Sequence, residues 1–336
     1  MVTASPRTLT RAHIASIATY LPPKVLSNAD LERMVETTDE WILQRTGIRE
    51  RHIADRGVGT SDLAYEASKQ AIERAGITPD DIDLIIVGTT TPDMVFPSTA
   101  CLLQAKLGAS RAWGFDLSAA CSGFTYSLTI AAQIVGTGRS KHALVIGADV
   151  MSSIIDYTDR TTCVLFGDGA GAVVVSATED ESIGVIDFEH YVDGTGGHAL
   201  CMPAGGSLRP ATHETVEQRL HFVKQEGQTV FKFAVRNMEE VCRRILERNK
   251  IDPASLDLFA AHQANRRIIG LTAEKLGVPT EKVLINIDRY GNTTGGTIPL
   301  VLNDALEQGR LKRGDLVLLA SVGAGFTVGA VLLRWG

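Results

Sequence analysis

The chain has 336 residues, of which 44% are hydrophobic and 21% are charged, and its formal net charge is −6. This profile is typical of a globular protein with room for two cores, and it gives no electrostatic reason to expect nucleic acid or an anionic membrane as a partner. Five scattered cysteines without a CxxC pair argue for a reducing compartment and against zinc. Since no apolar run reaches about 18 residues and no secretion signal is visible, we expect a cytoplasmic protein without a membrane span.

In chain order, the first clear pattern is a helix followed by a strand. Residues Leu63–Ala75 have the spacing of an amphipathic helix, and Leu84–Gly88 form a short apolar run that predicts a strand. The same order recurs in the second half of the chain, with a helix over Met238–Asn249 and a strand over Leu258–His262. The sequence therefore contains this unit twice.

The connecting segments support an internal duplication. Residues 73–84 and 247–258 share Glu-Arg, Ile, Pro and Asp-Leu at identical spacing. A repeat with so long a period indicates duplicated domains and not a solenoid. We expect an α/β protein built from two halves, 1–180 and 181–336.

Cys121 lies between a predicted strand over 112–117 and a helix over Phe124–Val135 that is apolar nearly all round. At a helix N-terminus the backbone N–H groups and the helix dipole favour the thiolate, which is the nucleophilic form of cysteine. Small neighbours leave room for a carbonyl to approach. The alternative is a small buried hydrophobic residue, which is how we interpret Cys101, Cys163, Cys201 and Cys242.

The second half supplies two polar candidates. His262 follows the predicted strand Leu256–Ala261, at the carboxyl edge where open α/β sheets place ligands. A strand predicted over Val283–Ile287 leads to Asn292, before a helix that begins near Thr297. Asn292 thus occupies the place that Cys121 has in the first half, and the two helix N-termini can converge on one pocket.

Six motifs closely resemble β-ketoacyl-acyl-carrier-protein synthase III, a condensing enzyme of the thiolase-like superfamily, and the resemblance covers essentially the whole chain. The motifs are Thr37-Thr-Asp-Glu-Trp-Ile42, Arg45-Thr-Gly-Ile-Arg-Glu-Arg51, Ala119-Ala-Cys-Ser-Gly-Phe124, Phe166-Gly-Asp-Gly-Ala-Gly171, His262-Gln-Ala-Asn265 and Tyr290-Gly-Asn-Thr293. The resemblance implies a five-layered αβαβα thiolase fold, a homodimer, no cofactor or metal, and a catalytic triad of Cys121, His262 and Asn292.

The implied reaction is a decarboxylative Claisen condensation that starts fatty-acid synthesis. Cys121 takes an acyl group from acyl-CoA, and malonyl-acyl carrier protein then loses CO₂ to give an enolate that attacks the thioester. Neutral His262 and the Asn292 amide are expected to donate hydrogen bonds to the enolate, and the backbone N–H groups of Cys121 and Ala324 to form the oxyanion hole.

Substrate contacts are also implied by the resemblance. The positions that match the coenzyme A site and tunnel are Trp41, Arg45, Arg160, Phe231 and Asn265. The basic patch for the acidic carrier protein corresponds to Arg267, with Arg266 and Lys232.

The acyl pocket is implied to be closed by Phe96, which would reach across the homodimer, so we expect a short primer, acetyl-CoA above all. The family's aromatic residue before the glycine loop is Val322 here, which opens space near the triad. The loop 201–225 has no recognisable motif and can border either the acyl tunnel or the dimer.

The sequence disfavours two other kinds of enzyme in the superfamily. A thiolase would carry a second cysteine in the loop Gly323-Ala-Gly-Phe326, and an elongating condensing enzyme would have a histidine in place of Asn292. A starter-unit or quinolone-type synthase with the same triad and a different acyl donor stays open. A non-catalytic assembly subunit would lack the nucleophile, whereas Cys121 is present.

Overall fold

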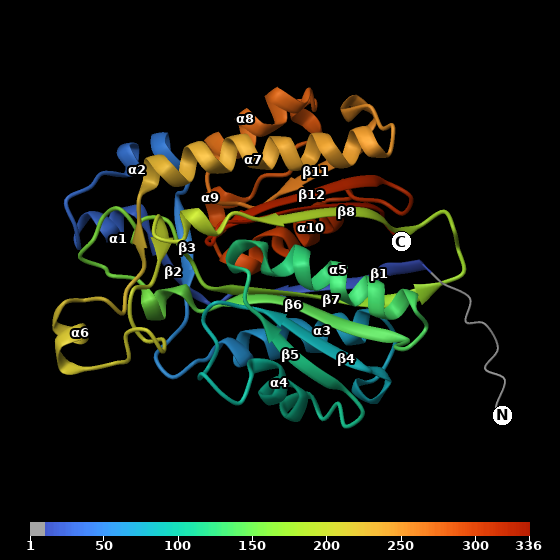
Figure 1. The fold of residues 1–336 in the computed structure, drawn as a ribbon, viewed down its shortest axis with the longest axis horizontal. Coiled ribbons are helices and arrows are strands. Elements are labelled where there is room, and N and C mark those ends of the chain that lie inside the picture. Colours follow the sequence, from blue (N-terminus) through green and yellow to red (C-terminus); the bar gives the residue numbers. More distant parts are fainter. Residues whose placement is uncertain (1–10) are drawn as a thin grey trace.

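The structure is a computed structural model that describes residues 11–336. Two β-sheets lie one above the other, with helices between them and on both outer faces (Figure 1). None of the helices within residues 11–336 is long and apolar enough to cross a membrane.

Both halves of the chain contain strands and helices. The strands are β1 (Arg11–Tyr20), β2 (Lys24–Ser27), β3 (Glu50–Ile53), β4 (Leu84–Gly88), β5 (Trp113–Leu117), β6 (His142–Asp149), β7 (Gly169–Thr178), β8 (Gly184–Val192), β9 (Leu200–Cys201), β10 (Lys224–Gln225), β11 (Leu258–Ala261), β12 (Leu316–Gly323) and β13 (Thr327–Arg334). The α-helices are α1 (Asn28–Glu32), α2 (Asp39–Thr46), α3 (Thr60–Arg74), α4 (Thr99–Leu107), α5 (Gly123–Gly136), α6 (His213–Glu217), α7 (Gly227–Arg248), α8 (Arg266–Leu276), α9 (Ile287–Tyr290) and α10 (Thr297–Glu307).

The two main sheets have the same internal topology. The first has the order β1-β7-β6-β4-β5, and the second has the order β11-β12-β13-β8. In the first, β4 is parallel to β6 and β7 is antiparallel to β6; in the second, β11 is parallel to β12 and β13 is antiparallel to β12. In the second sheet, no strand within residues 11–336 corresponds to β5. A single β-bridge between Phe259 and Val283 lies at that position. The predicted strand Val283–Ile287 is therefore wrong, because the chain turns into α9 instead of continuing along the sheet.

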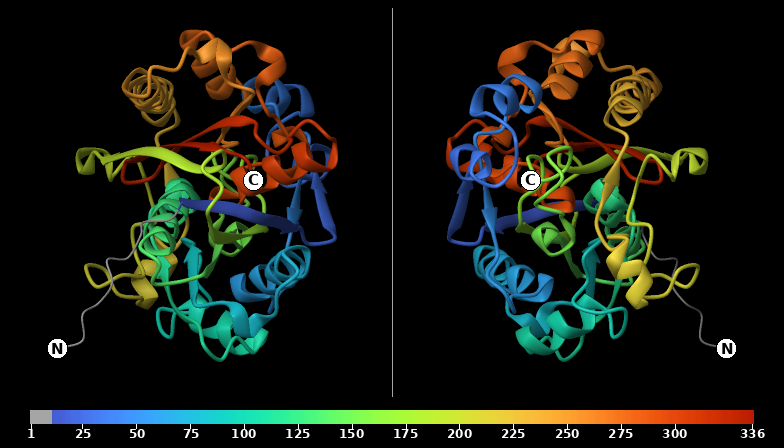
Figure 2. Two further views of the ribbon diagram at one scale, coloured as in Figure 1. Left: turned by 90° about the vertical axis from the view of Figure 1, so that its right-hand side faces the viewer. Right: turned by 90° about the vertical axis from the view of Figure 1, so that its left-hand side faces the viewer.

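Five layers result from the way the apolar faces pack. Helices α5 and α10 are buried between the two sheets, in a core that includes Phe124, Leu128, Ile298 and Leu302. Helices α3 and α4 cover the outer face of the first sheet, and α7 and α8 cover the outer face of the second (Figure 2). This arrangement confirms the five-layered αβαβα thiolase fold expected from the sequence.

The duplication aligns the two halves residue by residue. Strand β4 pairs with β6, and the counterpart β11 pairs with β12. The number of residues between paired positions is the same in both cases. A 3₁₀ turn, Ala120–Ser122, precedes α5, and the matching turn Thr294–Gly296 precedes α10. The first residue of each turn has a positive φ, 47° at Ala120 and 50° at Thr294. The counterpart of Cys121 is therefore Gly295, and Asn292 lies one turn earlier than the sequence analysis expected.

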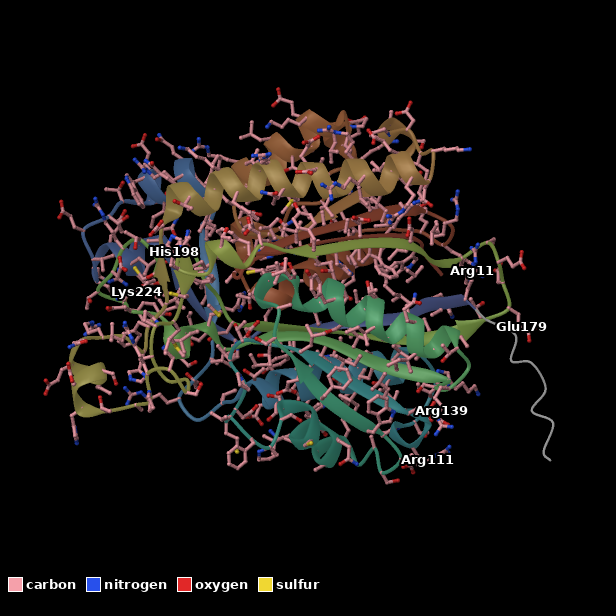
Figure 3. All side chains as sticks on the ribbon, viewed as in Figure 1. Arg11, Arg111, Arg139, Glu179, His198 and Lys224 are labelled. Carbon is pink, nitrogen blue, oxygen red and sulfur yellow. The ribbon has the colours of Figure 1, made fainter. Side chains whose placement is uncertain are left out.

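A small cap covers one end of the sandwich. It contains the β2–β3 pair with α1 and α2, and a hairpin over 200–225 in which β9 pairs with β10 and α6 lies at the tip. Figure 3 shows His198, which precedes β9, and Lys224, the first residue of β10, at the end of the molecule opposite Arg111 and Arg139. The cap lies at the end where β4, β6, β11 and β12 finish, and so it borders the site.

Candidate active site

Cys121, His262 and Asn292 line one cavity between the two sheets. All three side chains are buried, with exposed fractions of 7%, 1% and 5%. They come from different elements: the turn before α5, the residue after β11 and the segment before α10. The fold thus brings together the three residues that the sequence analysis proposed as a triad.

Cys121 is held in the turn that follows β5, directly before α5. Burial raises the pKa of its thiol to about 12, and the negative charge of Asp149 acts in the same direction. The sequence analysis expected the helix N-terminus to favour the thiolate. This expectation was wrong for the resting protein, because desolvation of a fully buried sulfur outweighs the favourable N–H interaction.

The expected oxyanion hole lies beside Cys121. The N–H groups of Cys121 and Ala324 donate to no backbone carbonyl of another residue within 11–336. Gly323 brings the two segments together, since a Cβ there would lie 2.7 Å from the Cys121 nitrogen and 2.9 Å from the Ala119 oxygen. The glycine is required at this position so that the loop containing Ala324 can approach the nucleophile.

His262 is fixed through its Nδ1 atom, which lies 2.6 Å from the hydroxyl of Thr297. That hydroxyl is 3.1 Å from the carbonyl oxygen of Thr294, which can only accept, so Nδ1 of His262 is the donor to Thr297. Nε2 then carries a lone pair and has no partner among the described residues. Burial lowers the His262 pKa to about 3, so the ring is neutral.

This tautomer changes the expected role of His262. A neutral ring with its proton on Nδ1 can accept the proton of the Cys121 thiol, but it cannot donate to an enolate until Nε2 has taken up a proton. The sequence analysis expected a donor in the neutral form. The resting structure provides an acceptor instead.

Asn292 is held through its backbone and its side-chain oxygen. Its N–H donates to Leu165 O at 2.9 Å, and its carbonyl accepts from Gly167 N at 3.1 Å. Its Oδ1 accepts from the Thr294 N–H at 2.9 Å, which leaves Nδ2 as the donor in the cavity. The Asn292 amide is therefore a preformed donor for a developing negative charge.

A wider cavity of about 570 Å³ leads from the surface to the triad and shares Phe231 and Asn265 with the triad cavity. Trp41 lies at this mouth, with the guanidinium carbons of Arg45 and Arg160 at 4.6 and 5.4 Å from its ring centre. The amide of Asn265 donates to the Arg45 carbonyl at 2.8 Å, which ties α8 to α2. The residues proposed for coenzyme A therefore lie together at one entrance.

The residues proposed for the carrier protein are exposed around the same mouth. Arg267 lies over the Phe231 ring at 5.2 Å, and Lys232 and Arg267 both line the mouth. Arg266 is exposed beside them but packs against Gly47 and is not on the cavity wall. The three cations form a basic rim on α7 and α8.

Beyond Cys121 lies a second, mostly apolar chamber of about 140 Å³. Most of its wall is formed by residues for which the sequence predicted no role in the site: Thr90, Met151, Ile154, Leu200, Cys201, Met202, Val223 and Thr294. Cys201, interpreted from the sequence as a small buried hydrophobic residue, is only partly buried. The hairpin 200–225 thus borders this chamber through both of its strand regions. Periodicity could not identify these residues, because they meet only when the hairpin packs over the sheet ends.

The two residues proposed for the acyl pocket, Phe96 and Val322, do not line this apolar chamber in the single chain. Val322 is buried in the wall of the triad cavity, next to Phe231 and Phe326. Phe96 is 83% exposed and lines neither cavity in the single chain. Its proposed contact with the pocket requires a second copy. Within residues 11–336, no cluster of three or more His, Cys, Asp or Glu could hold a metal ion.

Comparison with known proteins identifies the family of this fold and site. The family described as 3-Oxoacyl-[acyl-carrier-protein (ACP)] synthase III matches residues 115–194, and its C-terminal counterpart matches residues 246–335. A curated relative from Koribacter versatilis, named beta-ketoacyl-[acyl-carrier-protein] synthase III, is 59% identical and covers 97% of this chain and 98% of its own.

Solved structures agree along nearly the whole chain. The 3-oxoacyl-[acyl-carrier-protein] synthase III of Aquifex aeolicus superposes with a TM-score of 0.89 at 46% identity, covering 96% of this chain and 100% of its own. The priming β-ketosynthase of a polyketide biosynthetic pathway superposes with a TM-score of 0.91 at 34% identity, covering 100% and 99%. The chain belongs to the 3-oxoacyl-[acyl-carrier-protein] synthase III family.

Proposed function

We propose that Cys121, His262 and Asn292 catalyse the condensation of a short acyl-CoA with malonyl-acyl carrier protein, to give 3-oxoacyl-acyl carrier protein, CO₂ and CoA. As a member of its family the chain is a condensing acyltransferase that starts fatty-acid synthesis. The observation that carries the residue assignment is the common cavity of the three side chains, placed between a basic mouth and an apolar chamber.

In the first half-reaction, the thioester carbonyl of acyl-CoA lies against the N–H groups of Cys121 and Ala324. The Cys121 proton moves to Nε2 of His262 as the sulfur attacks, because thiolate and imidazolium are each disfavoured alone in this buried site. The CoA sulfur leaves and takes up that proton. Cys121 then carries the acyl group as a thioester.

In the second half-reaction, the malonyl group of the carrier protein enters through the same mouth and loses CO₂. The enolate oxygen is stabilised first by the Asn292 Nδ2 donor. His262 adds a second donor after Nε2 has taken up a proton from solvent, since the proton of the first half-reaction has left with CoA. The enolate carbon attacks the Cys121 thioester, and the oxyanion hole stabilises the tetrahedral intermediate. Collapse of this intermediate breaks the bond between the acyl carbon and the Cys121 sulfur, the sulfur takes the proton from Nε2, and the product leaves on the carrier protein.

The proposed binding surfaces follow the same path. Trp41, Arg45 and Arg160 hold the nucleotide end of coenzyme A, and Phe231 and Asn265 line the route of its pantetheine arm. The basic rim of Lys232, Arg266 and Arg267 receives the acidic carrier protein. The reaction uses no cofactor, and we place the enzyme in the cytoplasm as a homodimer.

The acyl group enters the chamber beyond Cys121. Its small volume and apolar wall suit a short chain such as acetyl, and Phe96 of a second copy is proposed to close its far end. An aromatic side chain that is 83% exposed in the single chain is consistent with burial in a dimer. Each additional methylene that the chamber excludes would forgo about 0.8 kcal/mol of burial.

A second candidate function is a starter-unit synthase that uses the same triad with a different acyl donor. Its support is the full-length structural likeness to the priming β-ketosynthase of a polyketide pathway. The chemistry at Cys121 is the same in both cases. The acyl donor and the pathway that uses the product distinguish them.

The test separates the two half-reactions in three variants. Cys121→Ala should abolish acylation and condensation but keep part of the malonyl decarboxylation, whereas His262→Ala and Asn292→Ala should lose most decarboxylation and still acylate in part. Acylation is followed by the mass of the Cys121 peptide, and decarboxylation by CO₂ release. Normal condensation by Cys121→Ala would refute the assignment.

A panel of acyl-CoA donors, assayed by the same mass shift, distinguishes the two functions. Acetyl-CoA should acylate the wild-type protein faster than octanoyl-CoA or dodecanoyl-CoA. Preference for a long chain would favour the starter-unit synthase and remove the support for a Phe96 gate.

A further inference from the structure

Asp149 is a fully buried carboxylate at the end of β6, with an exposed fraction of 0%. It has no ion-pair partner within residues 11–336. A buried group of this kind is strongly unfavourable unless hydrogen bonds satisfy it. Its partners therefore indicate what it holds in place.

One oxygen of Asp149 holds the segment after β4. Oδ1 accepts from the Thr90 and Thr91 N–H groups at 2.8 and 3.1 Å, and from the hydroxyls of Thr89, Thr90 and Thr91 at 2.9–3.0 Å. These bonds stay within the first half of the molecule.

The other oxygen reaches into the second half. Oδ2 accepts from the Thr294 hydroxyl and from the Gly295 N–H at 3.3 Å. Both residues belong to the turn before α10, where Thr294 has a positive φ that a β-branched residue rarely adopts. Asp149 therefore fixes a strained turn from across the interface between the halves.

That turn is linked to both Asn292 and His262. The Thr294 N–H donates to Oδ1 of Asn292 at 2.9 Å, and the Thr294 carbonyl accepts from the Thr297 hydroxyl, which in turn accepts from His262. A shift of Thr294 would release the Asn292 amide directly and the His262 ring through Thr297. Thr294 connects the two, and Asp149 anchors Thr294.

We propose that Asp149 is a positioning residue for the second half-reaction, which sets the orientation of Asn292, and more remotely of His262, through Thr294. The inference rests on the proposed function of the triad. Asp149 does not line the triad cavity or the acyl chamber, so it acts through its partners.

The same carboxylate has two further effects. Its charge helps to raise the pKa of the Cys121 thiol. Besides Cys121, the titratable residues on the walls of the triad cavity and the acyl chamber are His262 and Cys201. The Asp149 carboxylate also accepts hydrogen bonds from the hydroxyls of Thr90 and Thr294, which both line the acyl chamber. The chamber wall is thereby less able to hydrogen-bond water.

The test is Asp149→Asn in the full-length protein. The amide would turn an NH₂ group toward either the backbone N–H groups of Thr90 and Thr91 or that of Gly295, none of which can accept. Malonyl decarboxylation should fall about 100-fold, as for loss of a preformed donor, while acylation of Cys121 falls less than about 10-fold. Peptide-resolved alkylation of Cys121 by iodoacetamide should reach its midpoint at a lower pH than in the wild type.

Asp168→Asn is the matched control. Asp168 is also a fully buried carboxylate, but it accepts from Ser152 and from the Ala54 N–H and does not contact Thr294 or Asn292. Its loss should cost stability without separating the two half-reactions and without moving the alkylation midpoint of Cys121.

Thr294→Val and Thr294→Ser keep the test valid should Asp149→Asn not fold. Thr294→Val removes the hydroxyl and keeps the shape, so it should reproduce the loss of decarboxylation with the alkylation midpoint unchanged, since the charge remains. Thr294→Ser should restore decarboxylation. Full decarboxylation in Thr294→Val, or equal losses of both half-reactions in Asp149→Asn and Asp168→Asn, would overturn the proposal. A wild-type protein that neither acylates nor decarboxylates would instead count against the proposed function.

Discussion

The ends of the central strands differ between the two halves in a complementary way. In the first half, β4 ends at Gly88, which packs against Gly123 at the start of α5; a Cβ on Gly88 would lie 2.7 Å from the Gly123 carbonyl carbon. The equivalent position after β11 is His262, whose ring bonds to Thr297 at the start of α10. A glycine in one half thus corresponds to a proposed catalytic side chain in the other.

The neighbouring strand shows the reverse arrangement. In the first half β6 ends at Asp149, which bonds to Gly295 in the turn before α10. In the second half β12 ends at Gly323, which lies against Cys121 in the turn before α5. The side chain is now in the first half and the glycine in the second.

The duplicated backbone therefore provides two similar turns, and the exchange of glycine and side chain makes them chemically different. The first turn gains an open approach to a nucleophile. The second turn gains a carboxylate behind it and a histidine beside it, and so presents donors. Substitutions that make the strand ends more alike should remove this difference.

The largest effect is expected from Gly323→Ala. The new Cβ would lie within 3 Å of the Cys121 nitrogen and the Ala119 oxygen, which are backbone atoms that cannot rotate away. Both the nucleophile and the oxyanion hole should be displaced, and acylation of Cys121 should fall about 1,000-fold, or about 4 kcal/mol of barrier. Single-turnover acylation by acetyl-CoA measures this.

Gly270→Ala controls for the added methyl group. A Cβ at Gly270, on helix α8, has no heavy atom within 4 Å, so acylation should be unchanged and stability equal or slightly higher. If Gly323→Ala acylated like Gly270→Ala, the close approach of Gly323 to Cys121 would have no role.

Gly88→Ala should act mainly on stability. Its Cβ would press on the Gly123 carbonyl and push the start of α5 away from the first sheet. We expect the free energy of unfolding to fall by about 3 kcal/mol, measured by urea denaturation. Gly194→Ala, with open space around its Cβ, should change it by less than about 0.5 kcal/mol. A similar value for both variants would show that the first half does not depend on this contact.

The smallest effect concerns pH. Burial lowers the His262 pKa to about 3 from its ordinary value of 6.5, so the unfolded chain binds a proton that the folded chain refuses as the pH falls below about 6.5. Stability should therefore decrease with acid, by about 2 kcal/mol from this group between pH 7 and pH 5. His262→Ala should reduce the difference in the free energy of unfolding between pH 7 and pH 5 by that amount. An unchanged difference would mean that His262 is protonated in the folded protein.

The fold and the convergence of Cys121, His262 and Asn292 on one cavity could be predicted because their sequence signals are continuous segments. The repeat of helix, turn and strand indicated two halves, and the motifs around Cys121, His262 and Asn292 are continuous in sequence. The charge state of Cys121 could not be predicted in this way. It depends on burial by both halves and on Asp149, neither of which its neighbours in sequence reveal.

Asp149 itself gave one weak signal in the sequence, its place shortly after the apolar run 144–146, since α/β sheets often have functional residues after a strand. Its role depends on Thr294 in the other half, so no local pattern could show it. The acyl chamber was anticipated only as one of two possible neighbours of the loop 201–225, and the residues of its wall could not be predicted for a similar reason. Met151, Met202 and Val223 become neighbours only when the hairpin over 200–225 packs against the sheet ends.

The buried, protonated thiol of Cys121 also affects how long the enzyme stays intact between turnovers. Peroxides and soft electrophiles react with thiolates, and their rates depend on thiolate content and on access to the sulfur. A sulfur that is 7% exposed, with its pKa raised to about 12, offers little of either. In the proposed mechanism the sulfur becomes reactive when a bound thioester allows His262 to take its proton. The substrate would then determine when the cysteine is vulnerable as well as when it reacts.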